Sequence, residues 1–154
     1  MLYICSLELD LQPMSLGRIL AIDYGTKRTG LAATDPLRII ANGLDTVATA
    51  EVFEYLDAYL AREEVTLFVV GEPMHADGSP AQIAHLVVGF VRKLRKKYPD
   101  IPVEMMDERY TSEEAKLIIR QSGLKKKQRR DKSLVDKISA VLILQDYMDE
   151  HLPS

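Results

Sequence analysis

Apolar residues follow two spacings along this chain, and each spacing predicts one kind of element. Short apolar runs predict strands at 18–23, 29–34, 38–41, 66–71 and 102–106. Apolar residues three and four positions apart predict helices at 49–63, from Ser79 and Pro80 to Pro99, from Thr111 to Gly123, and at 133–149. Three strands joined by turns, followed by alternating strands and helices, predict an α/β fold: a mixed five-stranded sheet with helices on both faces.

The first residues stand apart from this pattern. Pro13 interrupts residues 1–17, and Met14 offers an alternative start. We expect residues 1–17 to form a mobile or loosely attached extension. A chain of 154 residues suits one hydrophobic core, so we expect residues 18–150 to form a single domain.

Composition narrows the function classes without choosing one. The net charge of -3 argues mildly against a nucleic-acid partner, so the placement of the charges matters more. The single cysteine, Cys5, makes no intrachain disulfide, which favours a reducing compartment. There is no basic leader segment and no apolar run as long as a membrane span. We therefore expect a cytoplasmic protein without a membrane partner.

Carboxylates follow several predicted strands. Asp23 ends the first strand, Glu72 the fourth, and Asp107 and Glu108 the fifth, while Asp136 lies in the first turn of the last helix. If these strands run parallel, their ends share one edge of the sheet, and Glu72 approaches Asp23 if the first and fourth strands are neighbours. Clustered carboxylates repel each other unless cations hold them together, and their oxygens suit a pair of Mg²⁺ or Mn²⁺ ions. Two such ions promote phosphodiester cleavage.

Each acidic residue also has a simpler explanation. Asp23 can serve as a turn residue, Asp136 as the partner of Ser133 in a capping box, and Asp107 as a cap for the next turn. Glu72 can be a solvated strand-end charge, and Glu108 can pair with Arg109.

A basic run lies just before the last helix. The simpler explanation for such a run is a solvated loop. Beside an acidic metal site, the same run would suit a phosphate backbone. The predicted nucleic-acid-binding residues are those of the run and three further cations close to the acids: Lys125, Lys126, Lys127, Arg129, Arg130, Lys132, Lys27, Arg28 and Arg109.

Four blocks of sequence resemble one known family. They are Ile22 to Ala32 (IDYGTKRTGLA), Val69 to Pro73 with Asp77-Gly78-Ser79, Asp107 to Ser112 (DERYTS), and Asp136 to Gln145 (DKISAVLILQ). In this order they resemble the YqgF/RuvX family of RuvC-like Holliday junction resolvases, whose members are also described as pre-16S rRNA nucleases. The resemblance covers about residues 18–149. It implies an RNase H-like fold and a metal-dependent nuclease site with Asp23, Asp136 and either Glu108 or Asp107.

One position departs from the family pattern. The second block usually reads Gly-Leu-Pro, but here it reads Gly71-Glu72-Pro73. More distant RuvC resolvases place a catalytic acid near the end of this strand. Our hypothesis is that Glu72 modulates metal binding.

The resemblance favours processing of the pre-16S rRNA 5′ end in ribosome biogenesis. Two alternatives stay open, cleavage of Holliday junctions and a non-catalytic rRNA-binding module. Residues 23–26 also resemble the phosphate loop of actin-like ATPases, but those enzymes need a second such block and this chain has one. Nothing in the sequence chooses between a monomer and a homodimer.

Overall fold

The computed structural model describes residues 16–72, 83–107, 111–123 and 131–153. Its strands form one sheet in the order β3-β2-β1-β4-β5, with bounds β1 Arg18–Asp23, β2 Arg28–Thr34, β3 Ala41–Ala48, β4 Val65–Glu72 and β5 Val103–Asp107. β1, β2 and β3 pair antiparallel, whereas β4 lies parallel to β1 and β5 lies parallel to β4. The predicted mixed sheet is therefore confirmed.

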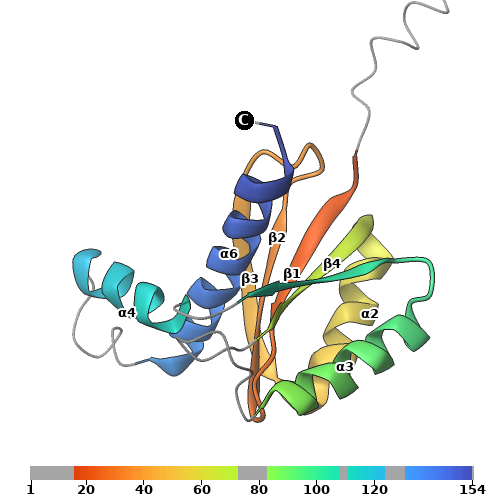
Figure 1. Cartoon of the computed structure of the whole chain (residues 1–154), viewed down its shortest axis with the longest axis horizontal. Coiled ribbons are helices and arrows are strands. Elements are labelled where there is room, and N and C mark those ends of the chain that lie inside the picture. Colours follow the sequence, from red (N-terminus) through yellow and green to blue (C-terminus); the bar gives the residue numbers. More distant parts are fainter. Residues whose placement is uncertain (1–15, 73–82, 108–110, 124–130, 154) are drawn as a thin grey trace, which may run out of the picture.

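Helices cover both faces of this sheet, as predicted (Figure 1). The 3₁₀ turn η1 Thr49–Glu51 leads into α2 Val52–Arg62, which packs with α3 Ala84–Lys97 on one face. On the other face lies α6 Lys132–His151, and α4 Thr111–Gln121 packs against α6. The predicted helix start at Ser79 and Pro80 and residues 1–15 of the predicted extension lie outside the described residues.

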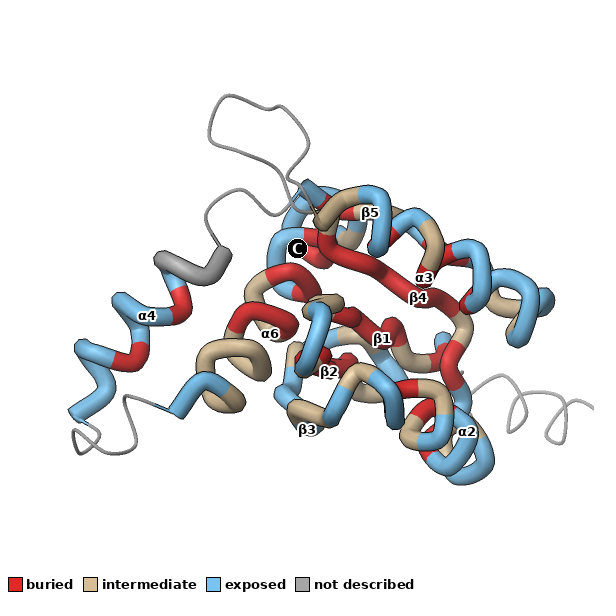
Figure 2. The backbone as a smooth tube through the Cα atoms, turned by 90° about the horizontal axis from the view of Figure 1, so that it is seen from below, coloured by how far each residue is buried: buried red, intermediate tan, exposed pale blue. Residues whose placement is uncertain are grey.

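The central strands alternate between two hydrophobic cores. In β1, Leu20 and Ile22 face the core under α2 and α3, whereas Ile19 and Ala21 face the core under α6. All four side chains are buried, and the tubes of β1 and β4 are mostly red in Figure 2. A strand covered on both faces reads as a continuous apolar run. The alternation of side chains along each strand also determines which face of the sheet the residue at the strand end occupies.

The prediction of a third strand at 38–41 is wrong, because β3 begins only at Ala41 and extends to Ala48. The Asp35 side chain accepts hydrogen bonds from the backbone N–H groups of Ile39 and Ile40 at 2.7 and 2.8 Å. These bonds hold the segment in a turn, and the bond from Ile40 is the main cause that lowers the pKa of Asp35. Ile39 and Ile40 are 67% and 58% exposed, so their apolar character misled the prediction.

Candidate active site

The turn between β1 and β2 follows Asp23 directly and is held at several points. A side chain at Gly25 would collide with the carbonyl oxygen of Arg28, so the turn requires glycine there. The Thr49 hydroxyl donates to the Gly25 carbonyl at 2.6 Å, and the Thr49 N–H donates to the Lys27 carbonyl at 2.9 Å. The first turn after β3 therefore fixes the loop that carries Asp23 and Arg28.

Asp136 reaches the same place from the other end of the sequence. Gly30 is the cross-strand partner of Asp23. A side chain at Gly30 would collide with the carbonyl oxygen of Asp136, so α6 packs directly on the β2 backbone. Asp23 and Asp136 thus flank Gly30, and antiparallel partners in a sheet lie only about 5 Å apart.

Strand alternation places Asp23 on the α6 face. Ala21, two residues earlier, belongs to the core under α6, and side chains two residues apart in a strand share a face. The next residue, Tyr24, points the opposite way and packs on Phe90 of α3 with ring centroids 4.8 Å apart. Tyr24 is therefore a packing residue, partly buried against the core under α2 and α3.

In the first turn of α6, the residue that caps the helix is not Asp136. Asp131 is the N-cap of the helix, and its side chain accepts a hydrogen bond from the Ser133 N–H at 2.9 Å. The proposed capping box of Ser133 and Asp136 is therefore wrong. Asp136 Oδ2 instead accepts a hydrogen bond from Arg28 Nε at 2.9 Å, and the two side chains are 27% and 39% exposed. Asp136 is thus oriented toward β2.

The structure separates Glu72 and Asp107 from this pair of acids. β1 and β4 are parallel neighbours, the condition that the sequence left open, so Glu72 ends at the same edge of the sheet as Asp23. Glu72 pairs with Asp107 in register. Val70 and Met105, two residues before them, face α2 and α3, so Glu72 and Asp107 lie on the face opposite Asp23. The strand ends predicted the edge of the sheet at which Glu72 and Asp107 lie. Their face follows from the alternation of side chains along β4 and β5.

The other predicted residues divide into two groups. Lys27 and Lys132 are exposed near Arg28 and the start of α6. The remainder lie outside the described residues: Glu108, Arg109, Lys125, Lys126, Lys127, Arg129 and Arg130.

The donor chemistry of the site fits a hard divalent cation. Asp23 and Asp136 supply carboxylate oxygens from one face. Within the described ranges, no three His, Cys, Asp or Glu residues gather closely enough to hold a metal. Ser139, which the sequence analysis did not single out, lies one turn after Asp136. Its hydroxyl is buried and has no hydrogen-bond partner in the described part of the chain.

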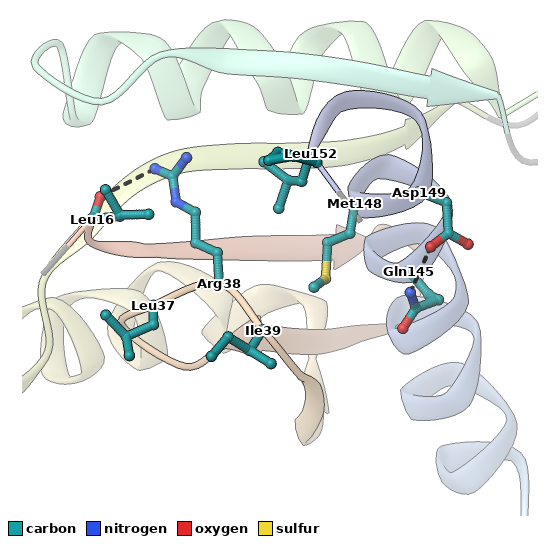
Figure 3. Close-up of a pocket in the computed structure, with 9 residues that line it drawn as sticks. Leu16, Leu37, Arg38, Ile39, Gln145, Met148, Asp149 and Leu152 are labelled. Atoms are coloured by element: carbon teal, nitrogen blue, oxygen red, sulfur yellow. Dashed lines mark hydrogen bonds between the residues drawn. The ribbon is translucent and has the colours of Figure 1, made fainter.

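A separate groove of about 540 Å³ lies at the opposite end of the sheet (Figure 3). Leu16, just before β1, and Leu37 and Ile39, in the turn after β2, line it together with Met148 and Leu152 near the end of α6. The groove contains none of the predicted site residues. The candidate active site therefore lies at the edge of the sheet where β1 ends in Asp23, away from this groove.

Known proteins similar in sequence to this chain are described as nucleases or resolvases. Residues 17–150 match the family model described as RuvX, Holliday junction resolvase. A relative from Parabacteroides distasonis, named as a candidate pre-16S rRNA nuclease, is 52% identical over 134 residues, which are 87% of this chain and 96% of the relative. A relative of the same name from Christiangramia forsetii is 49% identical over 135 residues, covering 88% of this chain and 100% of the relative.

Solved structures support the fold. Thermus thermophilus RuvC in complex with a Holliday junction substrate matches with a TM-score of 0.51 at 20% identity, covering 88% of this chain and 96% of RuvC. A second T. thermophilus RuvC structure matches with a TM-score of 0.52 at 19% identity, covering 86% and 96%. The RNase H-like fold is therefore confirmed. No helix in the described ranges combines the length and apolar character needed to cross a membrane.

Proposed function

This chain belongs to the RuvX family, and from that membership we propose that it is a metal-dependent nuclease that cuts phosphodiester bonds in structured RNA. The observation that carries the proposal is the convergence of Asp23 and Asp136 on either side of Gly30. Like charges repel each other, so acids that lie together need positive charge nearby, and Arg28 supplies it to Asp136 at 2.9 Å. A divalent cation bound between Asp23 and Asp136 would supply positive charge to both acids.

Asp23 and Asp136 would hold Mg²⁺ or Mn²⁺ ions, two by analogy with other nucleases of this chemistry. Such ions, when bound, activate water and stabilise charge on the attacking and leaving oxygens. The third ligand in this proposal is Glu108, by the family resemblance. Asp107 is the weaker candidate, because it lies with Glu72 on the face opposite Asp23. For the same reason Glu72 would influence the site at most indirectly.

The preferred substrate is the precursor of 16S ribosomal RNA in the cytoplasm. The support comes from two relatives at 52% and 49% identity that are named as candidate pre-16S rRNA nucleases. The description of the family favours a second candidate, the Holliday junction. The exposed cations Lys27 and Lys132 would contact the phosphate backbone in either case.

A cleavage assay tests the proposal and chooses the substrate. A pre-16S rRNA fragment and a four-way DNA junction would be incubated with Mg²⁺ or Mn²⁺ and wild-type protein, Asp23→Asn, Asp136→Asn or Glu108→Gln. We expect the RNA to be cut, and each variant to lose activity by about a hundredfold or more, because a ligand charge is removed. Glu72→Gln, at the same edge but on the opposite face, should keep most of the activity.

Three other outcomes would change the conclusion. Cleavage of the junction alone would assign the resolvase function. RNA binding without cleavage, kept in all three variants, would assign a non-catalytic rRNA-binding module. Loss of cleavage in Glu72→Gln as severe as in Asp23→Asn would return Glu72 to the set of metal ligands.

A further inference from the structure

Arg28 occupies a special position beside the two acids. It is the first residue of β2 and lies two residues before Gly30, so it shares the face on which α6 packs. From there Arg28 Nε donates to Asp136 Oδ2 at 2.9 Å. Asp23 pairs with Gly30 across the strands. In the described part of the chain, the Arg28 guanidinium therefore bonds one member of the acid pair, Asp136.

This ion pair is partly open to solvent. The side chains of Arg28 and Asp136 are 39% and 27% exposed, and water weakens ion pairs that are this accessible. A divalent cation carries twice the charge of a guanidinium and takes its ligands from carboxylate oxygens. The planar guanidinium, once free, matches the geometry of a phosphate group.

We propose that Arg28 is a positioning residue with two partners. In the metal-free protein it neutralises Asp136, and when a divalent cation is bound at the two acids it leaves Asp136 and binds a phosphate of the substrate. Arg28 would thus compete with the cation and link metal binding to recognition of nucleic acid. The inference rests on the proposed function, because it requires Asp23 and Asp136 to be the ligands.

The first test measures Mn²⁺ affinity by calorimetry on the intact chain, without any substrate. Arg28→Gln should bind Mn²⁺ roughly tenfold more tightly than wild type, because one neighbouring positive charge is removed. Asp136→Asn should bind it more weakly. Arg18→Gln is the matched control, because Arg18 also opens a strand and bonds a carboxylate through Nε, to Glu63 at 3.2 Å. The control should bind Mn²⁺ as wild type does.

The direction of the change decides the result. If Arg28 only orients Asp136, its loss weakens Mn²⁺ binding. Weaker or unchanged binding by Arg28→Gln therefore overturns the inference about Arg28 but leaves the proposed metal site standing. If wild-type protein does not bind Mn²⁺ at all, the proposed metal site itself is wrong. The two failures are therefore distinguishable.

The second test measures the binding of a short structured RNA at several salt concentrations. With Mn²⁺ present, Arg28→Gln should lower the slope of log affinity against log salt by about one, because one phosphate contact is lost. Without Mn²⁺ the slope should match that of wild type, since Arg28 is then held by Asp136. An equal loss of slope in both conditions would contradict the exchange of partners.

Discussion

At the scale of single residues, Gly30 determines how closely α6 approaches the sheet. A Cβ atom at this position would collide with the carbonyl oxygen of Asp136. Gly30→Ala should therefore push the start of α6 away from β2. We expect the free energy of unfolding to fall by about 1–3 kcal/mol and cleavage to fall further than stability alone explains. Urea unfolding and the cleavage assay measure the two effects.

Gly89→Ala is the matched control for this substitution. Gly89 lies inside α3, and a Cβ atom there would meet no atom within 4 Å. Because alanine favours the helix, the control should gain about 0.5–1 kcal/mol and keep its activity. If Gly30→Ala behaves like the control, the close packing of α6 on β2 is not important for the site.

The individual site residues were only partly predictable from the sequence. The family resemblance indicated Asp23 and Asp136, and the strand ends indicated Asp23 as well. The separation of Glu72 from Asp23 depends on the register of β1 and β4, which the sequence does not state. The bond of Arg28 to Asp136 joins residues 108 positions apart, and no local pattern encodes such a contact. Ser139 resembles any small helix residue until its burial is known.

At the scale of elements, Tyr147 of α6 lies in the core between this helix and the sheet. This side chain is 6% exposed, and burial, followed by its hydrogen bond with Glu104 of β5, raises the pKa of Tyr147 to about 12. The folded protein therefore holds this proton more tightly than the unfolded chain, whose tyrosines titrate near 10. Stability should be complete below pH 10 and fall by about 2–3 kcal/mol between pH 10 and 12.

Chemical unfolding of wild type and Tyr147→Phe across this pH range measures the effect. The variant should lack this share of the alkaline fall, although it loses the hydrogen bond and so about 1 kcal/mol at neutral pH. An identical alkaline fall in both proteins would show that other groups cause it.

Elements buried on both faces were predictable, and an exposed one was not. β1 and β4 are continuous apolar runs because both of their faces are covered. β3 is an edge strand whose residues are mostly exposed or half-buried, so it carries no strong hydrophobic signal. The apolar pair Ile39 and Ile40 lies in the turn before it, and the bonds to Asp35 outweigh its strand propensity.

At the scale of the whole molecule, the part that matches the family model accounts for nearly the entire described chain. The family model begins at residue 17. Leu16 already belongs to the fold, because its N–H donates to the Pro36 carbonyl at 3.1 Å. We expect a variant that lacks residues 1–15 to keep its melting temperature and its cleavage rate. A clear loss of either in thermal unfolding or the cleavage assay would assign these residues to the domain.

The packing of α6 on Gly30 also has a consequence for the order in which Asp23 and Asp136 come together during synthesis. Chains are synthesised from the N-terminus, so Asp23 and the whole sheet leave the ribosome before Asp136 does. Until α6 has emerged, one face of the sheet has no cover from that helix and Asp23 lacks its acidic neighbour. Under the proposed function, the two acids that would hold the cation therefore come together only after most of the chain has been made.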